Sequence, residues 1–543
     1  MTMTTGCVRL SRGGSSRSII GLPQSLSRNA GSVIFRRSGV VPSPTANLHH
    51  YHRLPSTSRS MTNSTVHRAL NAKNINPNIL KAQYAVRGEI AVRSEEYRKA
   101  LQAGAGHRLP FHSVISANIG NPQQLDQKPI TFFRQVLSIM EYPALIEHEE
   151  IFPEDVRERA RVLLEDVGSV GAYSQSQGAY GIRKSVANFI KERDGFEANP
   201  DDIFLTGGAS AGVHTLLNTI CASRNTGVLI PIPQYPLYTA TLALLDATAV
   251  SYHLNEEQKW STNVELIETA RQNAADNGTD VRCICVINPG NPTGSSLSVE
   301  DIKGVIRIAA KNHLVIMADE VYQTNVYDGV EFHSFKKVLR TLQREEPGRY
   351  DHVELVSLHS TSKGIVGECG HRGGYFELVN FDPEVKAQIY KLVSITLCPP
   401  VIGQCLVELM VNPPKEGEPS WELYNKERNH IFNGLESRAK ALYQAFKDMT
   451  GVSCQNPDGA MYLFPSITIP EKAQAEARSL GKQPDEFYCL KMLDATGICV
   501  VPGSGFGQVE GTWHFRTTFL PPGTEWVDRL KKFHEGFMKE YSD

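Results

Sequence analysis

The sequence predicts an α/β protein with a large, mostly parallel, helix-covered sheet and a second, smaller α+β domain. Three observations predict it: short apolar runs alternate with longer amphipathic stretches from about Ile75, each run ends in a polar or glycine-rich turn, and the pattern changes after about residue 405. A chain of 543 residues also exceeds what one hydrophobic core usually supports, which favours two domains.

Five apolar runs are predicted as buried strands: DIFLTGG from residue 202, GVLIPIP from 227, RCICVINPG from 282, LVIMADE from 314 and HVELVSLHS from 352. Helical stretches lie between them, including AGVHTLLNTICAS from 211 and SVEDIKGVIRIAAKNH from 298. In the second stretch Ser298 is a candidate N-cap and Asp301 lies in the first turn. This alternation of strands and helices favours a parallel sheet.

Chemically active residues collect where the predicted strands end. These ends carry Gly207 to Ser210, Tyr235, Asn288 to Gly294, Asp319 with Glu320, and Ser360 to Lys363. Ligands of parallel sheets bind outside the carboxyl ends of the strands, so we expect these residues to share one site.

The pattern after residue 405 predicts the smaller domain. A loop, VNPPKEGEPSWE from 411, precedes a long helix from Trp421 to about Met449. The elements AMYLFPSI from 460, GICVVPGSGFG from 497 and WHFRTTFL from 513 follow. We therefore predict a large domain over residues 119–405 and a small domain over 406–543, with residues 62–118 as an N-terminal arm and part of the small domain.

Composition limits the possible partners. Hydrophobic residues make up 41% and charged residues 21% of the chain, which is typical of a globular protein. A formal net charge of −2 gives no electrostatic case for nucleic acid, and no apolar run approaches the roughly 18 residues of a membrane span. Ten scattered cysteines without C-x-x-C or zinc spacing predict free thiols and no metal site.

The first sixty residues differ in composition from the rest of the chain. They contain eight arginines, no lysine and no acidic residue, and the first carboxylate of the chain is Glu89. This composition predicts an organelle transit peptide over residues 1–61, with a merely basic tail as the alternative. Arginine richness favours the mitochondrial matrix, and serine richness leaves a plastid open. The terminal Tyr541-Ser542-Asp543 does not resemble a peroxisomal signal.

Lys363 is the central candidate for chemistry. It follows Ser360, Thr361 and Ser362 and precedes a glycine-containing loop that ends at Arg372. A lysine amine attacks a carbonyl only in its neutral form, which neighbouring positive charge favours. Hydroxyls, glycines and an arginine together are typical of a phosphate site. The alternative is a solvated loop, but the combination predicts pyridoxal 5'-phosphate as a cofactor.

That cofactor requires four further groups, and the strand ends contain each of them. A buried carboxylate must pair with the ring nitrogen, and Asp319 ends a strand. Asn291 and Tyr322 can hydrogen-bond the ring oxygen, and Tyr235 can pack against the ring. The segment TGGAS from 206 leads into a helix whose N-terminus can bind the phosphate.

Taken together, the motifs GGAS, PQYPLY, NPGNPTG, ADEVY and STSKG, followed by an arginine, resemble the class I/II aminotransferases of fold type I. More narrowly, the chain is similar to the alanine aminotransferases of the plant and animal type. The motifs of this narrower resemblance are YAVRGEI, NIGNPQ, PITFFR, GAYSQSQGAYGIR, SKGIVGECGHRGGY, GAMYLFP and VVPGSGFGQVEGTWHFR. The similarity covers essentially everything after Ile75.

The resemblance implies a role for each candidate residue. Lys363 would hold the cofactor as a Schiff base and then serve as general base and acid, while Asp319 would pair with the ring nitrogen. The remaining implied contacts are Asn291 and Tyr322 to the ring oxygen; Tyr235 to the ring face; Ala209, Ser210, Ser360, Arg372 and Tyr173 of a second subunit to the phosphate; and Arg516, Gly120 and Asn291 to the substrate α-carboxylate. It therefore implies a homodimer with shared active sites. Arg372 follows Lys363 by nine positions. This spacing is one residue longer than in the aspartate-type enzymes, and the alanine-type members share the longer spacing.

The expected reaction is L-alanine + 2-oxoglutarate = pyruvate + L-glutamate, with amino-acid and 2-oxo-acid substrates. The alternatives are glutamate:glyoxylate aminotransferase and a lyase of the same fold such as aminocyclopropane-carboxylate synthase. A catalytically silent relative is a third alternative, but such a protein would be expected to have lost Lys363 or Asp319, and both are present.

Overall fold

The protein is described by a computed structural model over residues 69–84 and 88–542. The predicted transit peptide, residues 1–61, lies outside these ranges. Residues from Leu70 onward belong to one compact unit. Within the described ranges, no helix has the length and apolar character needed to cross a bilayer.

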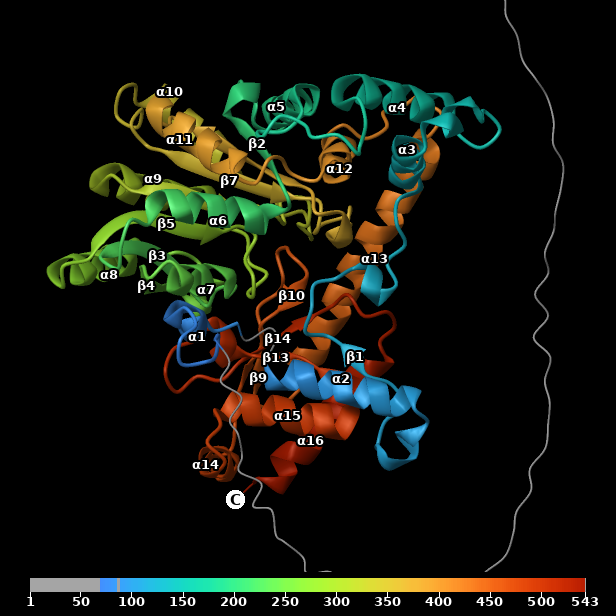
Figure 1. The fold of residues 1–543 in the computed structure, drawn as a ribbon. Helices are drawn as coiled ribbons and strands as arrows, with labels where there is room; N and C mark the ends of the chain where they lie inside the picture. Colours follow the sequence, from blue (N-terminus) through green and yellow to red (C-terminus); the bar gives the residue numbers. More distant parts are fainter. Residues whose placement is uncertain (1–68, 85–87, 543) are drawn as a thin grey trace, which may run out of the picture. The chain divides into compact units, whose positions relative to one another are not determined.

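A mostly parallel sheet organises the larger part of the described chain, as predicted (Figure 1). Its seven described strands follow the order β2-β8-β7-β6-β5-β3-β4, and only β8 runs antiparallel to its neighbours. The strands are β2 (Ile203–Thr206), β3 (Thr226–Ile232), β4 (Thr248–His253), β5 (Asp280–Ile287), β6 (Val315–Asp319), β7 (Leu355–Ser360) and β8 (Gly374–Val379). All five predicted strands are confirmed. The edge strand β4 was not predicted, and only its Val250 and Tyr252 are buried.

The reversed direction of β8, which was also not predicted, positions Arg372. In the register of β7 and β8, Ser360 lies opposite Gly374, the first residue of β8. The carboxyl end of β7 and the amino end of β8 therefore lie at the same edge of the sheet. Arg372, two residues before β8, is thereby brought to the edge where β6 ends at Asp319.

Helices cover both faces of the sheet because successive strand residues point to opposite sides. Cys283, Cys285 and Met317 belong to the core beneath one set of helices, whereas Ile284 and Ile316 belong to the core on the other face. The first set is α6 (Ala209–Ile220), α7 (Leu237–Leu244) and α11 (Pro383–Ser394). The second set is α8 (Val264–Asp276), α9 (Val299–Asn312) and α10 (Phe335–Glu345). The predicted N-cap of α9 is confirmed, since Ser298 and Asp301 form a reciprocal capping box.

A third core lies beside the β2 edge of the sheet. It joins residues of β2 and β8 to four helices and to Tyr424 of the long helix described below, and it includes Leu205, Tyr375 and Val407. The helices are α3 (Thr131–Glu141), α4 (Glu154–Val167), α5 (Tyr180–Asp194) and α12 (Val401–Val411). They pack pairwise, α3 on α4 and α12 on both α3 and α5.

A second group of helices and short strands has its own apolar core, which includes Leu435, Leu493 and Phe515. Its helices are α2 (Glu89–Gln102), α14 (Glu471–Ser479), α15 (Pro484–Thr496) and α16 (Glu525–Glu540). Its strands are β1 (Ile115–Ser116), β9 (Val452–Ser453), β10 (Tyr462–Leu463), β11 (Ser466–Ile467), β12 (Ile498–Cys499), β13 (Val501–Pro502) and β14 (Phe515–Thr518). β1 pairs with β12, so a segment before residue 119 joins the C-terminal elements.

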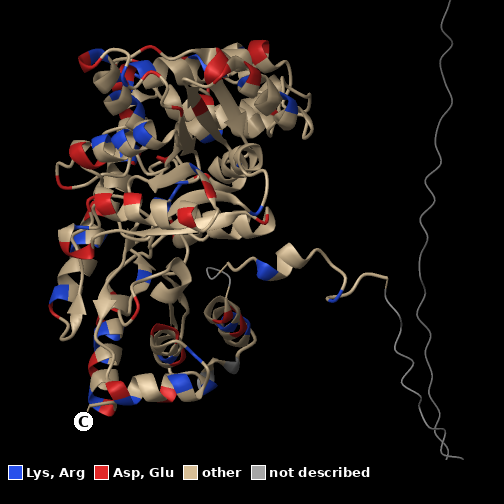
Figure 2. Ribbon diagram, turned by 90° about the vertical axis from the view of Figure 1, so that its left-hand side faces the viewer, with Lys and Arg blue, Asp and Glu red and all other residues tan. Residues whose placement is uncertain are grey.

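The long helix predicted from Trp421 is confirmed as α13 (Trp421–Lys447), which contacts α3 at one end and β9 at the other (Figure 1). The division into residues 62–118, 119–405 and 406–543 stays a prediction, and its last boundary falls inside α12. A short helix, α1 (Pro77–Lys81), packs on α7. Charged residues of both signs are interspersed over the described elements (Figure 2).

Candidate active site

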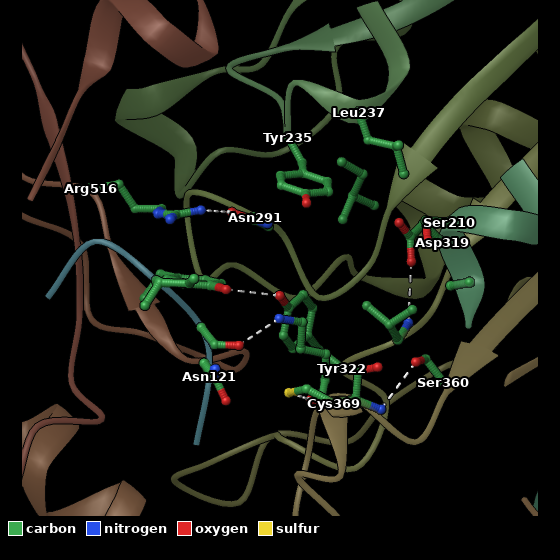
Figure 3. A pocket seen from close by; sticks show the side chains of 18 of the residues that line it. Asn121, Ser210, Tyr235, Leu237, Asn291, Asp319, Tyr322, Ser360, Cys369 and Arg516 are labelled. Atoms are coloured by element: carbon green, nitrogen blue, oxygen red, sulfur yellow. Dashed lines mark hydrogen bonds between the residues drawn. The ribbon is translucent and has the colours of Figure 1, made fainter. Parts of the chain in front are cut away.

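A cavity of about 350 Å³ lies at the carboxyl edge of the sheet, where residues of the second group of elements also reach it. Every predicted site residue except Tyr173 lines it: Gly120, Ala209, Ser210, Tyr235, Asn291, Asp319, Tyr322, Ser360, Lys363, Arg372 and Arg516. Figure 3 shows several of these side chains directed into the same space. The strand ends therefore converge as the sequence predicted.

Lys363 extends from the end of β7 toward the segment that contains Gly120. Its Nζ donates a 2.7 Å hydrogen bond to the Gly120 carbonyl oxygen. A Cβ at residue 120 would lie 3.1 Å from this amine and would collide with the Tyr462 hydroxyl. Glycine at this position therefore keeps space open beside the lysine amine.

Asp319 is a buried carboxylate with one side-chain donor. The Tyr238 hydroxyl donates a 2.7 Å hydrogen bond to its Oδ2, and the Val321 amide donates to its Oδ1. Burial raises the pKa of Asp319 above its ordinary value, while these two hydrogen bonds and the charge of Lys363 act in the opposite direction. A cation placed against Asp319 would favour its ionised form.

Arg516 reaches the cavity from β14 and is almost completely buried, with 2% of its surface exposed. Its guanidinium donates to Asn291 Oδ1 at 3.0 Å and to the Asn118 carbonyl, and it lies 4.3 Å from the centre of the Tyr462 ring. Its Nε has no hydrogen-bond partner, and no carboxylate of the described residues forms an ion pair with it. A buried cation without a counter-charge is unfavourable, so this site is suited to an anionic ligand.

The loop before α6 and the loop before β8 form a second anion site. Gly208, with φ 92°, is the N-cap of α6 and has no side chain to accept from the first-turn amides. A Cβ there would collide with Arg372, whose guanidinium donates to Gly207 O at 2.9 Å and to Ser362 Oγ at 3.2 Å. The helix N-terminus and the guanidinium together suit a phosphate group.

The loop between Lys363 and Arg372 ends in a short turn. Residues Cys369–His371 form one turn of 3₁₀ helix, after which Arg372 adopts a left-handed conformation with φ 55°. The Ser360 hydroxyl lies beneath this loop, where it donates to Gly373 O at 3.3 Å and accepts from the Ser362 amide at 3.0 Å.

Two tyrosines connect the neighbourhood of Lys363 to Arg516. Tyr322 Oη lies 3.2 Å from Tyr462 Oη, and both rings are buried. Burial opposes ionisation of Tyr462, but the charges of Lys363 and Arg516 and the hydrogen bond from Tyr322 lower its pKa below the ordinary value. Tyr322, in contrast, has its pKa raised well above the ordinary value by burial.

Some residues of the site were not predicted. Tyr462 lies within the quoted motif GAMYLFP, but only the tertiary structure places it between Lys363 and Arg516. Tyr238 is the last residue of the quoted motif PQYPLY and lies in the first turn of α7, but its contact with Asp319 was not predicted. Tyr84 lines the cavity from the segment after α1. Tyr173 lies outside the cavity, with 78% of its surface exposed.

The residues present fit the predicted cofactor. Pyridoxal 5'-phosphate has a carbonyl group, a basic ring nitrogen and a phosphate. Lys363, Asp319 and the α6 N-terminus with Arg372 match these three groups, and Arg516 remains for a second anion. The collision of a Cβ at Gly208 with Arg372 shows that this cradle requires glycine.

The family "Aminotransferase class I and II" matches residues 136–527. The chain belongs to this family. Pyridoxal phosphate is the cofactor of the family, and the donors described above agree with it. The Saccharomyces cerevisiae protein named "Alanine aminotransferase, mitochondrial" is 54% identical over 519 residues, which cover 94% of this chain and 88% of that relative.

A second Saccharomyces cerevisiae relative, named "Inactive alanine aminotransferase", is 52% identical over 478 residues, 86% of this chain and 94% of the relative. The solved structure of an alanine aminotransferase from Pyrococcus furiosus superimposes on this aminotransferase with a TM-score of 0.66. The superposition covers 85% of this chain and 100% of the Pyrococcus furiosus chain, at 23% sequence identity. It confirms the fold type I architecture.

Proposed function

We propose that this aminotransferase catalyses L-alanine + 2-oxoglutarate = pyruvate + L-glutamate with bound pyridoxal 5'-phosphate. The observation that carries the proposal is the convergence of Lys363, Asp319 and the unpaired Arg516 on one cavity. The 54% identity to a relative named alanine aminotransferase supports the choice of substrate over the glyoxylate alternative.

The cofactor, when bound, withdraws electrons from the substrate α-carbon and so makes its proton acidic. Asp319 would hold the ring nitrogen in its protonated form, because a buried carboxylate stabilises an adjacent cation. Asn291 and Tyr322 would donate to the ring oxygen, and Tyr235 would pack against the ring face. Burial of Asp319, Asn291 and Tyr322 keeps water from competing for the same contacts.

Lys363 Nζ takes the proton from the substrate α-carbon and later returns a proton, so it acts as general base and then as general acid. Arg516 binds the α-carboxylate with two parallel N–H donors, and Asn291 and Gly120 complete that contact. The fixed carboxylate orients the α-carbon toward the lysine amine, which lies beside Gly120.

Ala209, Ser210, Ser360 and Arg372 would hold the phosphate. Arg372 already lies within hydrogen-bond range of Ser210 Oγ, at 3.4 Å, which supports a joint role. Tyr173 of a second subunit completes this contact in a homodimer. The high exposure of Tyr173 in the single chain supports its availability to a partner.

The protein acts in the mitochondrial matrix, with a plastid as the alternative. The arginine-rich, acid-free segment before residue 61 supports an organelle address, and the relative from Saccharomyces cerevisiae is named mitochondrial. Import followed by amino-terminal sequencing of the matrix protein tests this proposal, because retention outside both organelles would refute it.

A visible absorption spectrum of the purified holoenzyme tests the reaction. We expect L-alanine to bleach the band of the bound cofactor and 2-oxoglutarate to restore it. Lys363→Ala should lose both turnover and the absorption band of the cofactor attached to Lys363, while keeping its fold. A band that does not respond to alanine would refute the substrate assignment. If wild-type protein loaded with the cofactor lacked this band, the proposed role of Lys363 would be refuted. This experiment is decisive because a relative at 52% identity is named inactive.

A further inference from the structure

The proposed reaction requires one cavity to accept two different side chains, the methyl group of alanine and the longer carboxylate of glutamate. Three cations line the cavity among the described residues: Lys363, Arg372 and Arg516. Each already has a function, since Lys363 is the reacting amine, Arg372 belongs to the phosphate site and Arg516 binds the α-carboxylate. The lining therefore has no described cation left for a second carboxylate.

Two tyrosine hydroxyls meet at the same cavity. Tyr84 Oη and Tyr235 Oη are 2.5 Å apart, and their rings pack edge to face with centroids 6.2 Å apart. The segment before Tyr84 is attached to the sheet domain, because Lys81 forms a 3.0 Å ion pair with Asp246 and Asn78 donates to Leu244 O.

Tyr235 lies close to the groups that would hold the substrate. Figure 3 shows its ring on the same side of the cavity as Asn291 and Arg516. Burial raises the pKa of the Tyr235 hydroxyl well above its ordinary value, and the neighbouring Tyr84 adds to this, while the charge of Arg516 acts in the opposite direction. The hydroxyl therefore stays protonated and able to donate across the physiological pH range.

Each hydroxyl has one proton to donate, and in the pair one hydroxyl donates to the other. In the described part of the chain, neither hydroxyl has a further hydrogen bond. One donor of the pair is therefore available to a ligand even when the pair is closed, and two are available when it opens. Two neutral donors can bind one carboxylate, because a carboxylate accepts at both of its oxygens.

The pair has an advantage over a fixed arginine. With alanine bound, an arginine in place of Tyr84, which is 38% exposed, would have no carboxylate partner in the cavity. Two hydroxyls instead hydrogen-bond to each other when only a methyl group is present, so each has a partner and no charge is left unpaired. A self-satisfying pair can therefore accept both kinds of side chain.

We propose that the Tyr84 and Tyr235 hydroxyls form the subsite for the side-chain carboxylate of glutamate and 2-oxoglutarate. The pair opens to donate to the carboxylate and closes on itself when alanine or pyruvate is bound. Tyr84 is then a specificity-determining residue of the reaction. This inference rests on the proposed function, since it concerns the side chain of that reaction's second substrate.

The test compares Tyr84→Phe holoenzyme with the wild type in the binding of two unreactive acids. Glutarate and propionate correspond to glutamate and alanine without the amino group, and calorimetric titration measures their dissociation constants. We expect Tyr84→Phe to weaken glutarate binding about 10-fold or more, as loss of a hydrogen bond to a charged group does. Propionate binding should change less than about twofold. Single-turnover rates with L-glutamate and L-alanine should change in the same pattern.

Tyr142→Phe is the matched control, because Tyr142 is 63% exposed and does not line the cavity. An unchanged glutarate affinity in Tyr84→Phe would overturn the subsite, as would equal weakening of both acids, which indicates a structural role. If the wild type bound glutarate but converted neither amino acid, the proposed function would fail, and the glutarate comparison would still decide the subsite.

Discussion

The Tyr238 hydroxyl donates a 2.7 Å hydrogen bond to the buried carboxylate of Asp319. It is the only side-chain donor to that carboxylate in the described residues. The pairing couples the first turn of α7 to the end of β6, and it opposes the rise in the pKa of Asp319 that burial causes. The proposed contact of Asp319 with the cofactor ring would therefore depend on Tyr238.

Tyr238→Phe should weaken cofactor binding about 10-fold, because the pKa of Asp319 rises further and its ionised form becomes less favourable. Titration of the apoprotein with pyridoxal 5'-phosphate, followed by visible absorption, measures the dissociation constant. Tyr252→Phe is the control, since Tyr252 is equally buried but donates to Cys285 O away from the cavity. Equal weakening in both variants would show a general loss of packing instead.

Arg516→Lys should lower kcat/KM about 100-fold for both amino acids, because an ammonium group cannot make two parallel contacts with a carboxylate. The visible spectrum of the bound cofactor should be retained. Steady-state rates with alanine and glutamate measure the effect. Arg529→Lys, whose guanidinium donates to Thr496 O outside the cavity, should leave the rates unchanged. A loss confined to one substrate would contradict an α-carboxylate role.

Gly120→Ala should reduce turnover by at least about 10-fold, because the added methyl collides with the Tyr462 hydroxyl and lies 3.1 Å from the Lys363 amine. Tyr462→Phe in the same chain removes the colliding oxygen, so the double variant should recover part of the loss. The two single variants and the double variant form a mutant cycle that measures the coupling. Simple additivity of the two losses would show that the collision is not the cause.

Glu320→Gln should change how thermal stability depends on pH. Burial raises the pKa of Glu320 to about 7, opposed by the charge of Arg193 and by hydrogen bonds from Ser357 and the Phe335 amide. The folded carboxyl therefore keeps a proton that the unfolded chain has released. Its contribution to the free energy of unfolding is fully present below pH 4.5 and is lost as the pH rises to about 7.

Glutamine cannot titrate, so the stability of Glu320→Gln relative to the wild type should increase by up to about 3 kcal/mol between pH 4.5 and 7. Melting temperatures of both proteins across this range measure it. Burial lowers the pKa of His359 to about 3, which gives the opposite pH dependence, but this histidine is present in both proteins and largely cancels in the comparison. A pH-independent difference would show that Glu320 is ionised throughout.

Five of the seven described strands of the sheet, and most residues of the cavity, could be predicted from the sequence. Each apolar run ended in a polar residue, and parallel strands bring their carboxyl ends to one edge, so Asp319, Asn291 and Lys363 had to lie near one another. The resemblance of the motifs to an aminotransferase family then implied a role for each residue, and the family is confirmed.

The tertiary structure alone decided the contacts between distant segments. Arg516 meets Asn291 across 225 positions, and Tyr84 meets Tyr235 across 151, because separate groups of elements pack together at the cavity. The reversal of β8, which brings Arg372 to the site, likewise has no local signal. Apolar patterns determine which face of an element is buried, but strand register and the packing of one group of elements on another determine which polar side chains then meet.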